Sequence, residues 1–205
     1  MLIYWEVEAM KVFFLKMLLI LDCAWSNFYR VIELLFLPKE LGKLKRYQGG
    51  QHPHLAWQVY CRATELKHYG RDKWYMGFEV ISLPERFLAR KVGDCDDFAV
   101  LGHWFFNEIF EFDGARYKFQ GYFCIWSNDF KFMHWVAIWK NSANNGQPKY
   151  FRVSNFNAMF VGEICEGFHL DKKHKGLFAI GHITESLDCK LRFKRIYKSE
   201  NEVNL

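Results

Sequence analysis

A cysteine set among acids marks the most chemically suggestive stretch of the chain. Residues 93–97 read Gly-Asp-Cys-Asp-Asp, and apolar residues then recur at steps of three and four, the spacing of one helix face. Asp94 stands where an N-cap belongs, with Asp97 three residues on as a partial capping box. Cys95 is therefore expected in the first turn of a buried helix, where the helix dipole favours a thiolate.

A thiol nucleophile needs a base within hydrogen-bond reach and a group that orients the base. His134 lies in the alternating apolar segment 132–139, and Asn155 lies in the strand expected after it. If the turn at 144–146 joins two antiparallel strands, both side chains lie on one sheet face. The pattern predicts a Cys-His-Asn triad of Cys95, His134 and Asn155, with the backbone N–H of Cys95 as one oxyanion donor. The alternative for Cys95 is a buried structural thiol.

The expected elements run as helices first and strands afterwards. Helices are expected over 5–22, from Ser26 or Asn27 to Leu37, over 54–68, over 85–90, and from Cys95 to about Phe110; strands are expected over 117–126, 132–140, 149–156, 177–183 and 189–197. This order predicts an α+β domain with helices packed on an antiparallel meander. Residues 1–50 are interpreted as an N-terminal helical segment packed on the core, and residues 51–205 as the main domain.

Composition and charge narrow the function classes. The apolar fraction of 51% is ample for a core, and the aromatic fraction of 19% predicts either a dense aromatic interior or a partner surface. The net charge of +5 is mild, and the basic runs at 39–46 and 190–198 are interpreted as solvated surface. No recognised nucleic-acid motif is present, so a nucleic-acid partner is not expected.

The cysteines and the N-terminus bear on location. The six cysteines are scattered without a C-x-x-C pair, which favours reduced thiols in the cytoplasm. The apolar run 12–21 is interrupted by Lys16 and is too short for a membrane span. From Met10 the sequence resembles the start of a signal peptide without a clear cleavage site, so export is the alternative to a cytoplasmic location.

Three segments together resemble a known family. Residues 93–99 resemble the cysteine motif of the transglutaminase-like cysteine peptidases of bacteria and their phages. Trp74 and residues 82–85, Ser-Leu-Pro-Glu, resemble the lead-in to that motif, and His134 with its strand resembles the histidine motif. The resemblance covers about residues 72–157. It implies a papain-like core and a peptidase or isopeptidase that attacks a protein or peptide substrate through a thioester.

The third motif departs from the family, which usually carries Asp there. Here the segment reads Ser154-Asn155. Adjacent strand residues face opposite sides, and Asn155 is preferred as the residue that orients His134 because an amide accepts an imidazole N–H. A catalytically degenerate binding or structural protein and an acyl-transferring transglutaminase are the alternatives. The chemistry requires no cofactor; calcium is the alternative, because Asp96 and Asp97 resemble acidic positions of calcium-responsive relatives.

Overall fold

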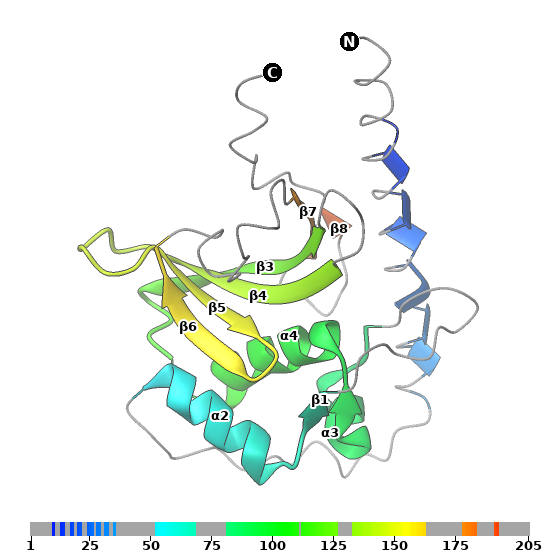
Figure 1. Ribbon diagram of the computed structural model, residues 1–205, viewed down its shortest axis with the longest axis horizontal. Coiled ribbons are helices and arrows are strands. Elements are labelled where there is room, and N and C mark those ends of the chain that lie inside the picture. Colours follow the sequence, from blue (N-terminus) through cyan, green and yellow to red (C-terminus); the bar gives the residue numbers. More distant parts are fainter. Residues whose placement is uncertain are drawn as a thin grey trace.

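A computed structural model describes the central part of the chain. The described residues are 52–68, 81–110, 112–126, 133–162, 178–183 and 191–192, with single positions between Met10 and Leu35. Helices and an antiparallel sheet form two layers, and the labelled helices lie along one side of the sheet (Figure 1). The α+β class predicted from the sequence is confirmed at this level.

The helices on this side of the sheet are short. They are α2 (Pro53–Ala63), α3 (Pro84–Arg90), α4 (Cys95–Trp104) and the π-helical turn η2 (Phe105–Ile109). Both α2 and α3 begin with proline, whose missing N–H is not needed in the first turn of a helix. The sequence predicted α3 and the start of α4, and the last part of that expected helix widens into η2.

The helix expected over 54–68 ends earlier than predicted. The Leu66 N–H donates to the Cys61 carbonyl at 3.0 Å, and the Glu65 N–H donates to the Arg62 carbonyl at 3.0 Å. These bonds close the helix through a left-handed residue, Glu65, with φ of 58°. The prediction of helix beyond Ala63 was wrong. Glycine usually occupies the left-handed position after a helix, and a glutamate there does not indicate a helix end.

The chain leaves α2 as a short strand beside the start of α4. This strand, β1 (Lys67–His68), pairs in parallel with β2 (Val92–Gly93), and His68 lies opposite Gly93. β2 leads directly into α4, so the ribbon carries His68 towards the turn that holds Cys95. Each strand has two residues, too few for a recognisable sequence pattern.

The sheet is antiparallel, as predicted. In spatial order β6-β5-β4-β3-β7-β8, it contains β3 (Tyr117–Trp126), β4 (Met133–Asn141), β5 (Tyr150–Ser154), β6 (Asn157–Val161), β7 (Phe178–Ile183) and β8 (Leu191–Arg192). The strands β3 to β6 form the predicted meander, but β7 pairs with β3 instead of continuing beside β6. The single strand expected over 149–156 ends at Ser154, which pairs with Asn157 across a two-residue turn and so begins an unpredicted β6. Most of the strand expected over 189–197 lies outside the described residues.

Aromatic side chains fill the space between helices and sheet. The Phe106 ring centroid lies 5.0 Å from that of Phe151 and 5.7 Å from that of Trp139, while Trp57 lies 5.4 Å from Phe105. Each large side chain buried in this way stabilises the fold by about 1.5–3 kcal/mol. The described residues therefore bear out a dense aromatic interior.

The described N-terminal positions are helical and mainly exposed. Met10, Phe13 and Phe14 are 60–66% exposed. Farther along, Ser26 is buried, and its hydroxyl accepts a hydrogen bond from the Ile81 N–H at 3.0 Å. Within the described positions, the structure has no helix with the length and apolar character needed to cross a membrane. The rest of the segment 1–50 lies outside the described residues.

Close packing of α4 on β5 gives a test of the fold. A Cβ added at Gly102 would lie 2.6 Å from Val153 Cγ1. We expect Gly102→Ala to lower the free energy of unfolding by about 1–3 kcal/mol through overpacking. The double variant Gly102→Ala/Val153→Ala should lose less than the sum of the two single variants, because Val153→Ala removes the clashing methyl. Denaturant unfolding monitored by tryptophan fluorescence measures these differences.

Gly114→Ala is the matched control for that experiment. A Cβ there meets the Phe112 carbonyl at 3.6 Å, an ordinary van der Waals contact. Equal destabilisation by the alanine substitutions at 102 and 114, or strict additivity with Val153→Ala, would contradict the packing described here.

Candidate active site

An ion pair between the partly exposed Arg90 and a buried aspartate fixes the first turn of α4. The Asp97 carboxylate is fully buried, and Arg90 Nη2 of α3 donates to its Oδ2 at 2.5 Å. A Cβ at Gly93 would overlap that carboxylate and lie 2.7 Å from the Phe87 ring, so the position between the two helices requires glycine. The capping box expected from the sequence is absent: Asp94 is the N-cap by position but makes no side-chain capping bond, and Asp97 turns to Arg90 instead.

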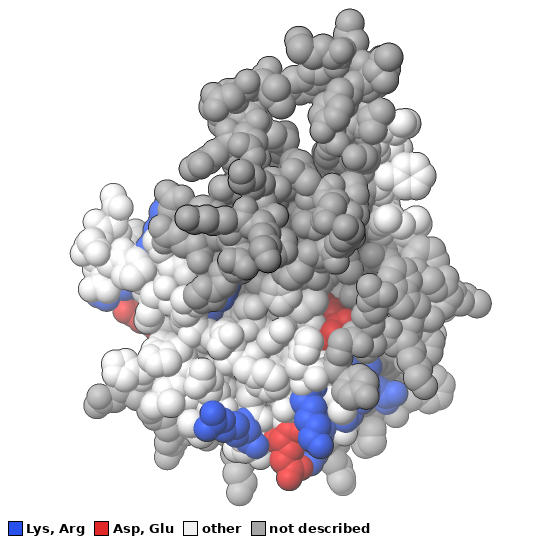
Figure 2. Space-filling view, in the orientation of Figure 1, with Lys and Arg blue, Asp and Glu red and all other residues white. Residues whose placement is uncertain are grey.

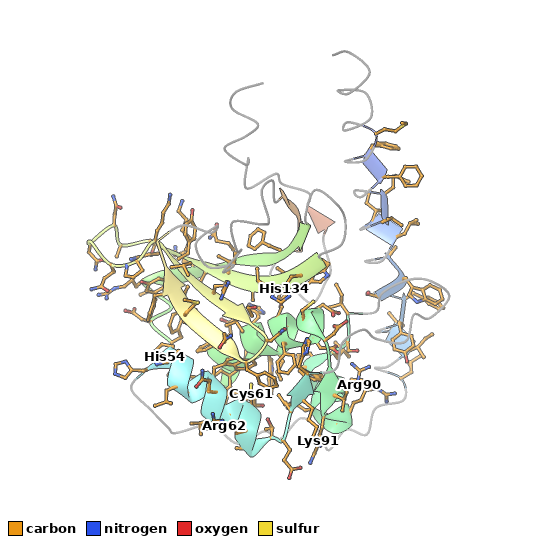
Figure 3. The ribbon with its side chains drawn as sticks, in the orientation of Figure 1. His54, Cys61, Arg62, Arg90, Lys91 and His134 are labelled. Atoms are coloured by element: carbon orange, nitrogen blue, oxygen red, sulfur yellow. The ribbon has the colours of Figure 1, made fainter. Side chains whose placement is uncertain are left out.

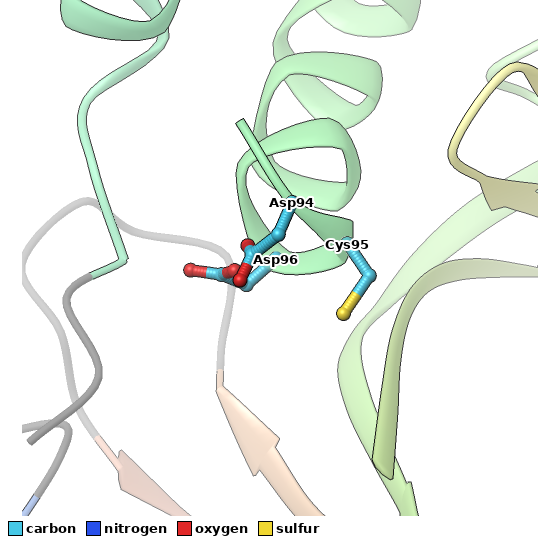
Figure 4. Close-up of side chains that lie close together, drawn as sticks. All are labelled: Asp94, Cys95 and Asp96. Carbon is cyan, nitrogen blue, oxygen red and sulfur yellow. The ribbon is translucent and has the colours of Figure 1, made fainter. Parts of the chain in front are cut away.

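Cys95 is the first residue of α4 and carries a half-buried free thiol. Its Sγ and one carboxylate oxygen each from Asp94 and Asp96 all lie within 4.8 Å of one another. In Figure 4 the two carboxylates point to one side of the turn and the thiol points to the other. Cys61, by contrast, is buried in the core, and burial raises the pKa of its thiol well above the usual range. Cys61 is therefore a structural thiol.

His134 contacts Ser154 across the sheet. The distance from His134 Nε2 to Ser154 Oγ is 2.6 Å. The register pairs Ala137 with Val153, so Val136 faces Ser154 and His134 is its diagonal neighbour on the same face. Ser154 therefore contacts the His134 ring through Nε2.

Asn155 does not occupy the position predicted from the sequence. It is the first residue of the turn between β5 and β6, with φ of 46°, a conformation that asparagine tolerates better than most residues. Its backbone carbonyl accepts a hydrogen bond from Trp57 Nε1 at 2.7 Å, and its side-chain Oδ1 is buried without a hydrogen-bond partner. The hydrogen bond to His134 comes from Ser154, so the preference for Asn155 over Ser154 is corrected.

The surroundings of His134 keep its ring neutral. Burial lowers the pKa of His134 to about 4, and Arg152 and His68 act in the same direction, while the Asp94 carboxylate opposes them. At neutral pH the imidazole is therefore uncharged and able to accept a proton. The influence of Asp94 also places His134 near the turn of α4 that holds Cys95.

Two residues at this site escaped the sequence interpretation. Arg152 is 4% exposed and lies two positions before Ser154, on the same sheet face. Burial lowers its pKa to about 10, which leaves it charged at neutral pH, and its Nη2 contacts Met159 Sδ at 3.1 Å. Because Arg152 lies two residues from Ser154 in the same expected strand, its position on the same sheet face could have been predicted from the sequence. His68 had none, because the pairing of β1 with β2 brings it to the site.

The acidic residues beside Cys95 do not match a calcium site. Calcium takes six to eight oxygen ligands, whereas the group of Asp94, Cys95 and Asp96 offers two carboxylates and a sulfur. Asp97, the other acid suggested for calcium, is held in the ion pair with Arg90. The described residues of this turn therefore give calcium no suitable set of donors.

Comparison with known proteins adds no family assignment. No model of a known protein family matches the chain, and no curated protein matches it. Of the lead-in residues, Trp74 lies outside the described residues, while Ser82, Leu83 and Pro84 are buried and run into α3. The likeness to transglutaminase-like peptidases thus depends on the motifs of the chain itself.

Protonation of two partly buried histidines should destabilise the fold. Burial lowers the pKa of His134 and that of His103 from 6.5 to about 4. The unfolded chain therefore binds more protons than the folded chain between about pH 6.5 and pH 4. The free energy of unfolding should be highest above pH 6.5 and fall as the pH decreases through this window, by on the order of 1 kcal/mol per pH unit for each histidine.

Urea unfolding at a series of pH values measures this slope. His134→Gln should flatten it, and the double variant His103→Gln/His134→Gln should flatten it further, since each substitution removes one group that titrates only when unfolded. A slope in the double variant equal to that of the wild type would contradict the neutral, buried state of these rings.

Proposed function

We propose that the protein is a thiol-dependent amide hydrolase, a peptidase or isopeptidase with a papain-like, transglutaminase-like core. Cys95 is the nucleophile, His134 the general base and Ser154 the residue that orients the base. The observation that carries the proposal is the 2.6 Å contact between His134 Nε2 and Ser154 Oγ. It holds the ring of a neutral imidazole through Nε2, and we assign proton transfer from the thiol to Nδ1.

The proposed reaction follows from these positions. Cys95 transfers its proton to His134 Nδ1, and the thiolate attacks the substrate carbonyl carbon to form a C–S bond. The tetrahedral intermediate expels the amine, which takes the proton from His134, and a thioester remains on Cys95. Water then gives a proton to His134 and attacks the thioester, and release of the acid returns that proton to the sulfur.

The first turn of α4 supplies the electrostatic part of the mechanism. Helix N-termini favour negative charge through the aligned peptide dipoles, and Cys95 is the first residue of this helix. The backbone N–H of Cys95 is the proposed donor to the oxyanion of the tetrahedral intermediate. The ion pair of Arg90 with the buried Asp97 keeps this turn in place while negative charge develops on the substrate oxygen.

Serine in place of the usual carboxylate makes protonation of His134 during the reaction less favourable. A hydroxyl accepts the imidazole N–H but brings no negative charge to stabilise the imidazolium. Arg152 and His68 also disfavour that cation, and Asp94 favours it. This balance is the specific observation in favour of the second candidate function, a catalytically degenerate protein that binds peptides without cleaving them.

The acceptor and the location complete the proposal. Water is the proposed acceptor of the acyl group; an amine acceptor would make the same thioester chemistry that of a transglutaminase. The substrate is a protein or peptide, since the mechanism acts on an amide carbonyl. A cytoplasmic location is proposed because reduced thiols are the rule there, and both cysteines with described side chains, Cys61 and Cys95, are free.

Alkylation of Cys95 by iodoacetamide at neutral pH tests the proposed nucleophile. We expect His134→Gln to slow the reaction about tenfold or more, because the thiol loses its base. Ser154→Ala should slow it about fivefold, the effect of losing one hydrogen bond worth about 1 kcal/mol. Peptide mapping by mass spectrometry distinguishes Cys95 from Cys61.

Asn155→Gly is the matched control, because glycine accepts the positive φ of that turn and removes only the amide side chain. It should alkylate like the wild type. Equal rates for wild type and His134→Gln, both typical of an ordinary thiol, would reject the catalytic pair.

A further inference from the structure

A charged pocket lies at the far end of the ribbon that leads to Cys95. Its volume is about 440 Å³, and it is lined by Arg62, Glu65, Leu66, Lys67, Lys91 and Val92. Three cations and one acid give its rim a net charge of +2. Figure 3 labels Arg62 and Lys91 around this region, and Figure 2 shows basic side chains on either side of an acidic one at the same edge of the molecule.

Both residues of one ion pair in this pocket adopt an unfavourable backbone conformation. Lys91 Nζ pairs with Glu65 Oε2, and the two residues have φ of 60° and 58°. Each ends a helix, α2 at Glu65 and α3 at Lys91, where glycine or asparagine is usual. The other non-glycine residues with positive φ in the described chain are asparagines. Charged side chains are thus kept where glycine would cost less, a pattern associated with functional sites.

The pocket lies within reach of a chain bound at Cys95. Val92 lines it and Cys95 follows three residues later. The intervening residues are extended, so this segment spans about 10 Å at 3.3–3.6 Å per residue. An extended peptide running alongside covers the same distance with about three residues.

We propose that this pocket binds an acidic side chain of the substrate, located about three residues from the amide that Cys95 attacks. The inference rests on the proposed function and specifies its substrate class as peptides with Glu or Asp near the cleavage site. Lys67 and Lys91 hold the carboxylate, and Arg62 adds to the positive potential of the rim. When no substrate is bound, the Glu65 carboxylate pairs with the lysine side chains, and the carboxylate of the substrate displaces it.

Fluorescence anisotropy with two labelled decapeptides tests the proposal on the full chain carrying Cys95→Ala. One peptide has consecutive Glu residues and the other has Gln at the same positions. We expect the Glu peptide to bind more tightly, and Lys67→Gln/Lys91→Gln to weaken it by about five- to twentyfold without changing the Gln peptide. Glu65→Gln should strengthen binding of the Glu peptide about two- to fivefold, since the competing carboxylate is gone.

Two controls separate the pocket from general charge and from unfolding. Lys118→Gln/Lys140→Gln removes the same charge from two exposed lysines that pair across β3 and β4, and it should leave binding unchanged. Lys91→Gly relieves the left-handed strain, so it should weaken the Glu peptide while the melting temperature stays the same or rises. Equal binding of the two peptides, or equal losses in the two lysine pairs, would overturn the proposal.

Protection of Cys95 in the otherwise unmodified chain links the pocket to the thiol. The Glu peptide should slow alkylation of Cys95 by iodoacetamide more than the Gln peptide does. Binding at the pocket without protection would overturn substrate recognition there. This measurement needs only a thiol that alkylates, so its outcome is independent of whether His134 activates Cys95.

Discussion

The ion pair between Arg90 and the buried Asp97 is the interaction on which the site depends. A fully buried carboxylate is costly unless it is paired, and this pair joins the end of α3 to the first turn of α4. The close fit of Gly93 between Asp97 and Phe87 leaves no room for another arrangement of the link. The direction of α4, and with it the position of Cys95, follows from this corner.

The charges around the site divide into two sets with different effects. Burial, Arg152 and His68 keep His134 neutral, while Asp94 alone among the stated influences favours its cation. In the proposed mechanism the base is neutral at rest, which differs from a resting thiolate–imidazolium pair. The sheet holds His134, and the β1–β2 ribbon holds His68 and Lys67, which lines the charged pocket.

Periodicity was enough to predict the class of fold and the strands near the site. The helical spacing after Cys95 and the alternation around His134 each lie in one continuous segment, and both were confirmed as α4 and β4. The end of α2, the two-residue strands and β6 were missed, because each depends on a turn whose residues give no usual signal, such as Glu65. From the sequence, either Ser154 or Asn155 could be expected to contact His134. The strand ends in a turn at Asn155, and for this reason Ser154 makes the contact. His68 joins the site through the pairing of β1 with β2, which leaves no local signal in the sequence, whereas the spacing of Arg152 from Ser154 in one strand could be read.

In the proposed function, Cys95 and His134 act together to form a thioester. Intact-protein mass spectrometry after brief exposure to an activated ester, p-nitrophenyl acetate, tests it directly, with peptide mapping to locate the acyl group. If Cys95 and His134 form the proposed pair, we expect one acetyl group on Cys95 in the wild type and little or none in His134→Gln under the same conditions. An unmodified Cys95 in the wild type, or equal acetylation of Cys95 in both proteins, would contradict it.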